Sequence, residues 1–118
     1  MTSPDGYPIT VRSPLLYHGT RYIDEVRQSG VLAVPTTGDQ HVSLTTSFRV
    51  ALYWAMMPRG NPGAETPGVV VFHRRHLLEA GYDLFAFDGT GHDDEAEMAC
   101  PQAIALSEVE HEVLRLVT

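Results

Sequence analysis

Three short polar clusters in the sequence hold the residue types that could do chemistry. They are His18-Gly19-Thr20, the hydroxyl-bearing residues Ser43, Thr45, Thr46 and Ser47, and the acidic Glu95-Ala96-Glu97. Each cluster borders an apolar stretch, and a polar tip on a buried strand is a common way to build a site. A carboxylate beside hydroxyl donors is suited to stabilising the sugar cation that forms when a glycosidic bond breaks. Taken together, the clusters predict one site with glycosidic chemistry.

Each cluster also has an ordinary structural explanation. His18 could be a hydrogen-bonded histidine at a strand end, Ser47 a helix cap, and the two glutamates part of a solvated acidic loop. Taken singly, these explanations are the better ones. Glu95 and Glu97, however, would point the same way if a strand begins at Glu95, and two carboxylates on one face need polar partners or a substrate.

Other groups are weaker candidates. His73-Arg74-Arg75-His76 could bind a phosphate or a metal, but no third ligand is near, so a solvated helix start is favoured. His92-Asp93-Asp94 could hold a cation, although nothing in the sequence fixes its geometry. Cys100 lies in an apolar stretch and is expected in the core rather than as a nucleophile. We predict no metal site.

Short strands and a few short helices must position the three clusters. We expect strands at residues 15–18, 42–45, 69–72, 84–87, 98–100, 104–106 and 113–117, and helices at 22–29, 48–57 and 73–80. Gly30 and Pro58 should end the first two helices. The second helix follows the N-cap Ser47 and is apolar nearly all round, so we expect it to be mostly buried. This pattern predicts the α+β class.

The composition bounds the rest. A chain of 118 residues is the length of one domain, with residues 1–13 expected at its periphery. The net charge is -7 and every basic residue is an arginine, which disfavours non-specific nucleic-acid binding. One cysteine excludes an internal disulfide, and neither a signal peptide nor a membrane-spanning stretch is visible. We expect a cytoplasmic protein without membrane contact.

The order of the clusters is similar to that of the ADP-ribosyltransferase superfamily. Tyr17-His18-Gly19-Thr20, then the run 42–47 leading into a helix with Ala51 and Tyr53, then Glu95-Ala96-Glu97 before a strand resemble its three motifs. These proteins follow a His-Tyr-Glu or an Arg-Ser-Glu scheme on a split β-sheet with a few short helices. The resemblance spans residues 15–117. It implies a small, toxin-like mono-ADP-ribosyltransferase of the bacterial or phage type that uses NAD as its substrate.

The resemblance also implies roles for individual residues. His18 would hydrogen-bond the adenosine ribose of NAD, Gly19 would hold the nicotinamide amide through its backbone, and Thr20 would line the same pocket. Tyr53, or its neighbour Trp54, would stack on the nicotinamide ring. Glu97 would be the catalytic carboxylate, and Glu95 would orient or activate the acceptor. The second motif leaves two candidates open, Ser43 and Thr45, because neither scheme matches it in full.

Two other functions remain open beside NAD-dependent transfer to a protein, nucleic acid or small molecule. RNA 2′-phosphotransferases share the histidine-glycine-threonine strand and a later histidine strand, to which His41-Val42 is faintly similar. A catalytically silent module that binds NAD or ADP-ribose is the other alternative. In a toxin-like setting an antitoxin or inhibitor would be a partner. Acceptor choice would depend on the loops at 35–40 and 59–67.

Overall fold

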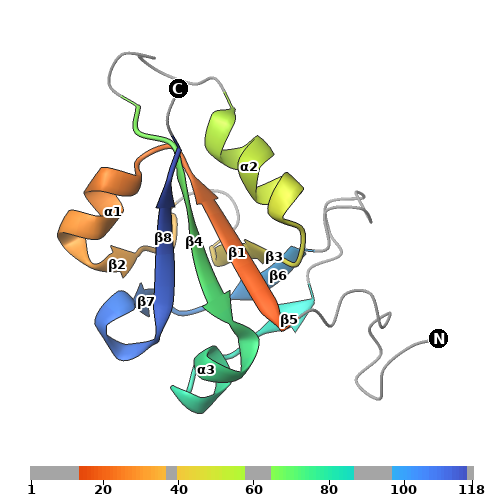
Figure 1. Ribbon diagram of the computed structural model, residues 1–118. Helices are drawn as coiled ribbons and strands as arrows, with labels where there is room; N and C mark the ends of the chain where they lie inside the picture. The colour runs from red at the N-terminus through yellow and green to blue at the C-terminus, as the bar shows by residue number, and fades with distance from the viewer. Residues whose placement is uncertain (1–13, 37–39, 58–64, 87–96, 117–118) are drawn as a thin grey trace.

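The strands and helices of the chain are drawn in Figure 1 from a computed structural model, which describes residues 14–36, 40–57, 65–86 and 97–116. The strands are β1 (Leu15–Thr20), β2 (Val31–Leu32), β3 (Val42–Thr45), β4 (Gly68–His73), β5 (Phe85–Ala86), β6 (Glu97–Cys100), β7 (Ile104–Ala105) and β8 (His111–Arg115). The helices are α1 (Ile23–Ser29), α2 (Phe48–Met56), α3 (Arg74–Glu79) and the short 3-10 helix η4 (Leu106–Glu108).

Six of the strands form one sheet in the order β5-β6-β3-β1-β4-β8, in which all neighbours are antiparallel. β2 and β7 form a separate two-stranded ribbon. The uninterrupted β-branched run in β4 pairs along its whole length with β1, from Leu15 opposite His73 to Thr20 opposite Gly68. The α+β class expected from the sequence is confirmed.

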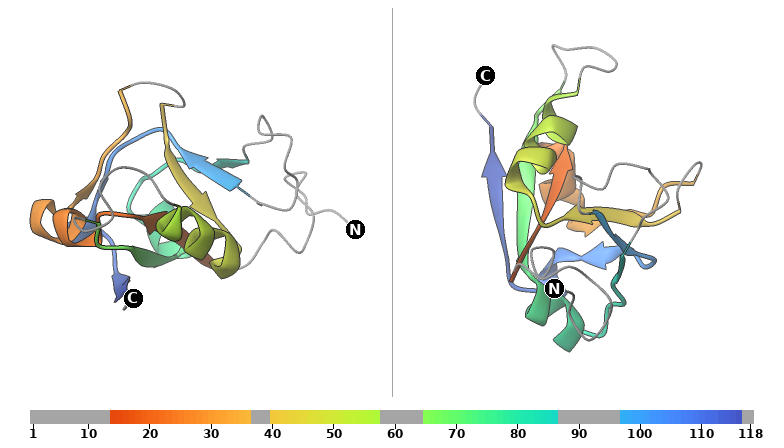
Figure 2. Two further views of the ribbon diagram at one scale, coloured as in Figure 1. Left: turned by 90° about the horizontal axis from the view of Figure 1, so that it is seen from above. Right: turned by 90° about the vertical axis from the view of Figure 1, so that its right-hand side faces the viewer.

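β1 and β3 meet at one position only. Tyr17 lies opposite Thr45, and beyond this pair the two strands diverge without further pairing between them in the part of the chain that the structure describes. Figure 2 shows the result: in its right-hand view β1, β4 and β8 stand upright, whereas β3 and β6 leave them at a steep angle. The sheet therefore has two three-stranded halves, β5-β6-β3 and β1-β4-β8, that separate next to His18.

One hydrophobic core joins the two halves. Leu16 of β1, Leu44 of β3 and Met98 of β6 are each at most 2 % exposed and belong to one cluster with side chains from α1, α3, β4 and η4. Because side chains alternate along a strand, His18 and Thr20 lie on the same face of β1 as Leu16, farther along it. That face of β1 changes from core to polar where the sheet opens.

Helix α2 covers the other face of β1. Gly19 is so close to it that a Cβ on this residue would overlap the carbonyl oxygen of Ala51 and lie 2.8 Å from its carbonyl carbon. Tyr17, on the same face, packs against Phe48 with ring centroids 5.3 Å apart. Glycine at this position is therefore needed for backbone packing.

The sequence placed most elements within two residues of their observed bounds, but the expected burial of α2 was wrong. Only Ala51 and Ala55 of α2 are buried, whereas Tyr53 is 65 % and Met56 52 % exposed. The helix approaches β1 through Ala51 and packs Phe48 against Tyr17, whereas Tyr53 and Met56 are turned toward solvent. The last strand runs from His111 to Arg115, two residues earlier than the expected 113–117, because η4 ends the preceding turn earlier.

Two more expectations concern the N-terminal residues 1–13 and the absence of membrane-spanning segments. Residues 1–13, expected at the periphery, lie outside the described residues. Among the helices that the structure describes, none is long and apolar enough to cross a membrane.

The contact between Gly19 and α2 predicts a large effect of one added methyl group. Gly19→Ala should lower the free energy of unfolding by about 2–3 kcal/mol, because the new Cβ meets backbone that cannot rotate away. Thermal and urea unfolding would measure this loss.

Gly30→Ala is the matched control. Gly30 caps α1 with a φ of +73°, and nothing lies within 4 Å of the place that a Cβ would take, so only backbone strain of about 1 kcal/mol is expected. A Gly19→Ala protein as stable as Gly30→Ala would contradict the packing argument.

Candidate functional site

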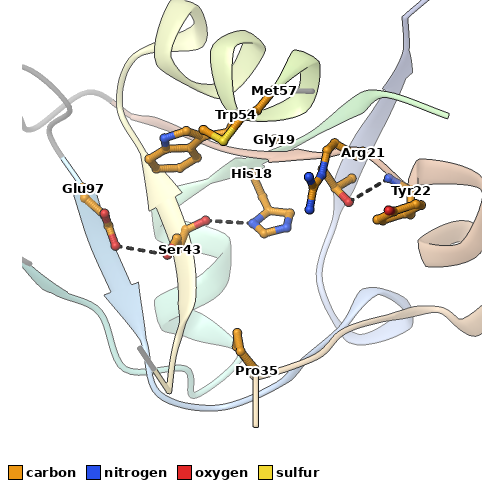
Figure 3. A pocket seen from close by; sticks show the side chains of 10 residues that line it. His18, Gly19, Arg21, Tyr22, Pro35, Ser43, Trp54, Met57 and Glu97 are labelled. Carbon is orange, nitrogen blue, oxygen red and sulfur yellow. Dashed lines mark hydrogen bonds between the residues drawn. The ribbon is translucent and has the colours of Figure 1, made fainter. Parts of the chain in front are cut away.

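Residues of β1 and β3, the strands that carry the first two predicted clusters, line the opening between the two halves of the sheet. Glu97 of the third cluster lines it as well. The opening is a cavity of about 520 Å³, within the range of about 300–1,000 Å³ that is usual for small-molecule sites. Its walls are His18, Gly19, Thr20, Arg21, Tyr22, Pro35, Ser43, Trp54, Met57 and Glu97. Figure 3 shows them: Glu97, Ser43 and His18 come from three adjacent strands, and Trp54 lies above them on α2.

Glu97, the first residue of β6, is 8 % exposed and is held by two hydrogen bonds. Ser43 donates its hydroxyl to Oε2 at 3.0 Å, and His41 donates Nε2–H to the same oxygen at 2.9 Å. Met98 and Cys100 belong to the core, so Glu97 points to the opposite face of β6, toward β3's polar side. Both donors bind the same oxygen, Oε2, so together they orient the carboxylate. Neither of these two bonds uses Oε1.

His18 bridges the two halves where the strands part. Its Nδ1 lies 2.7 Å from the backbone oxygen of Ser43, and because a carbonyl only accepts, Nδ1 must carry the proton. Burial lowers the pKa of His18 below its usual value of 6.5, and the bond to Ser43 only partly opposes this. At neutral pH the ring is therefore uncharged, and its Nε2 is a hydrogen-bond acceptor.

Gly19 and Thr20 continue the wall. The hydroxyl oxygen of Thr20 accepts a bond from the backbone N–H of Tyr22 at 3.1 Å, which shapes the turn that leads into α1. Among the described residues, the backbone of Gly19 is not paired with β3. This edge of β1 is therefore accessible to a ligand that approaches the backbone closely.

The two candidates for the second motif are placed differently. Ser43 lines the cavity and bonds Glu97, whereas Thr45 is fully buried and its hydroxyl accepts a bond from the Ser47 N–H at 3.1 Å. Ser47 in turn accepts from the Val50 N–H at 3.2 Å and caps α2, as the sequence predicted. Thr45 and Ser47 thus start the helix, and Thr45 does not line the cavity.

The two aromatic candidates also differ in position. Tyr53 is 65 % exposed and outside the residues that line the cavity, so it is not placed to stack on a ligand there. Trp54, one residue on, lines the cavity with Met57. The two differ because successive helix positions are rotated by about 100°. The sequence could not select between them, since both are apolar and adjacent.

Four wall residues were not among the predicted site residues: Arg21, Tyr22, Pro35 and Met57. Arg21 and Tyr22 follow the first cluster, with the guanidinium carbon 5.6 Å from the centre of the Tyr22 ring. Pro35 comes from the loop after β2. His41, the second donor to Glu97, was noted only as part of a different motif; its position two residues before Ser43 was the available signal.

Of the weaker candidates, Cys100, His73 and His76 are described and do not line this cavity. Cys100 is in the core, where burial raises the pKa of its thiol, so it remains protonated. His73 and His76 have ring centroids 5.1 Å apart, and in the described part of the chain no group of three or more potential ligands is placed to hold a metal. Glu95 and the run 92–94 lie outside the described residues.

Comparisons of the chain with protein-family models, with curated proteins and with solved structures each found no match. The function must therefore be argued from the cavity itself.

The partly buried, neutral His18 predicts a pH dependence. Its pKa is below 6.5 in the folded chain and near 6.5 when unfolded, so on acidification the unfolded chain takes up the proton first. His18 should therefore contribute to stability fully above about pH 6.5 and lose that contribution as the pH falls toward its folded pKa. NMR titration of the imidazole should give a midpoint below 6.5 and the Nδ1–H tautomer at pH 7.

His18→Gln supplies the control for this titration. The variant lacks the titrating ring, so acidification from pH 7 to 5 should destabilise it less than the wild type. A His18 midpoint at or above 6.5 would contradict a ring that is neutral at pH 7.

Proposed function

We propose that this chain is an NAD-dependent mono-ADP-ribosyltransferase of the glycosyltransferase class, built on a split sheet like that of the superfamily its motifs resemble. The observation that carries the proposal is the meeting of His18, Ser43 and Glu97 from three adjacent strands at one cavity. These residues come from clusters that are 25 and 54 positions apart along the chain, as the hydrogen bonds between them record. The pairing of β1 with β3 at a single position supports the split-sheet assignment.

The proposed reaction transfers ADP-ribose from NAD to an acceptor nucleophile. The bond between the nicotinamide nitrogen and C1′ of its ribose breaks, and the bonding electrons leave with neutral nicotinamide. Positive charge grows on the ribose, where the Glu97 carboxylate would stabilise it in a partly dry site. The acceptor then bonds to C1′ and loses its proton to solvent.

The neighbours of Glu97 suit this role. Ser43 and His41 both donate to Oε2, so the carboxylate is held in place before the substrate binds and little reorganisation is needed during reaction. His18 would accept a hydrogen bond from a ribose hydroxyl through Nε2. Trp54 would stack on the nicotinamide ring.

The RNA 2′-phosphotransferase alternative receives less support. Besides the histidine-glycine-threonine strand, which suits either function, it depended on His41, which is 8 % exposed, bonds Glu97 and is outside the residues that line the cavity. The acceptor, and any antitoxin or inhibitor, are left open by the cavity.

Replacement of Glu97 tests the catalytic role. Glu97→Gln keeps the size of the side chain but removes its charge, so release of nicotinamide from NAD should fall about 10²- to 10³-fold while NAD still binds. Chromatography of nicotinamide and calorimetric binding would measure the two effects. Glu108→Gln, at an exposed carboxylate on η4, is the matched control and should retain full activity.

Other outcomes separate the alternatives. NAD that raises the melting temperature of the wild type without any turnover would favour a silent binding module. No response to NAD, together with removal of a 2′-phosphate from RNA, would favour the phosphotransferase.

Trp54 gives an independent test because it is the chain's single tryptophan. Titration with NAD should quench its fluorescence, since the nicotinamide would stack on the indole ring. Trp54→Ala should weaken NAD binding about 3- to 10-fold, whereas Tyr53→Ala, at the exposed neighbour, should leave it unchanged. Equal effects of the two variants would be evidence against stacking on Trp54.

A further inference from the structure

We propose that Arg21 is an additional ligand-binding residue, which holds the pyrophosphate of the dinucleotide in this cavity. The inference rests on the proposed function for the identity of the dinucleotide, but its physical basis is separate. That basis is a guanidinium group in the cavity wall whose charge no carboxylate of the described residues neutralises through an ion pair.

The first observation is an unsatisfied donor. Nη1 of Arg21 is buried and has no hydrogen-bond partner among the residues that the structure describes. A buried donor without a partner is costly, and more so when it is charged. Arg75 and Arg115, by contrast, pair with Glu79 and Asp24 on the surface. Arg21 also lines the cavity, so an anion bound there would give its guanidinium group an oppositely charged partner.

The second observation is that the residue is anchored. The backbone oxygen of Arg21 accepts a bond from the Thr66 N–H at 2.7 Å, and the oxygen of Thr66 accepts one from the Ile23 N–H at 2.8 Å. The guanidinium group lies 5.6 Å from the Tyr22 ring centre, at the distance of a cation–π contact. Arg21 thus leaves a fixed turn, and less side-chain freedom is lost when it binds a ligand.

The third observation is that the acidic and the basic groups lie on opposite sides of the cavity. Figure 3 shows Glu97 and Ser43 on one side of His18 and Arg21 on the other. A carboxylate and a neutral imidazole acceptor suit ribose hydroxyls and a cationic sugar, and the guanidinium suits an anion. A ligand that matches this order carries a ribose with a phosphate beyond it. Arginine binds phosphate oxygens bidentately, which makes phosphate the natural anion here.

Binding measurements on Arg21→Gln test the inference. Affinity for NAD and for ADP-ribose should fall about 10- to 100-fold, while affinity for nicotinamide riboside, which has no phosphate, should be unchanged. Arg21→Lys should recover part of the loss, because it keeps the charge without the planar fork. Arg27→Gln is the matched control: this exposed arginine on α1 loses the same charge and should bind NAD as the wild type does.

Inorganic pyrophosphate separates this inference from the proposed function. If the wild type fails to bind NAD but binds pyrophosphate, and Arg21→Gln does not, the dinucleotide assignment fails and the phosphate site stands. If Arg21→Gln binds NAD and pyrophosphate as the wild type does, the inference is overturned. A lower melting temperature of the variant with unchanged affinities would also overturn it, because Arg21 would then be structural.

Discussion

The separation of β1 from β3 after a single backbone pair is the constraint on which the candidate site depends. If the two strands stayed paired, the ladder would occupy the space that the cavity now takes. His18 has a structural role in this opening, because its ring reaches from one strand to the backbone oxygen of Ser43 on the other. The same bond fixes the proton on Nδ1 and thereby sets what the ring offers to a ligand. One contact thus supports both the shape and the chemistry of the cavity.

Much of the fold could be predicted because its signals are local. The apolar run of β4, the glycine that ends α1 and the Ser47 cap each specify an element through neighbouring residues. The burial of α2 could not be predicted in this way. Its composition suggests a core helix, yet its close contact with Gly19 leaves only Ala51 and Ala55 enclosed. Which face of a helix is covered depends on the tertiary contact.

The candidate site was predictable in outline for a similar reason. Residue types and order indicated that His18, Ser43 or Thr45, and Glu97 would come together, but the choice between Ser43 and Thr45 depended on which hydroxyl begins α2. Likewise, Trp54 and Tyr53 differ only by their rotation about the helix axis. The sequence could not indicate that Nη1 of Arg21 has no hydrogen-bond partner among the described residues, because this depends on the three-dimensional surroundings of the side chain.

The two halves of the sheet share one backbone pair and a common core, and this has a thermodynamic consequence. A ligand that contacts His18 on β1 and Glu97 on β6 would tie the halves together at the point where the ladder is absent. By linkage, occupancy of the cavity would then stabilise the sheet, and anything that loosens β3 and β6 would weaken binding even without touching the ligand. Ligand affinity and the cooperativity of unfolding would then both report on how firmly β1 and β3 are joined.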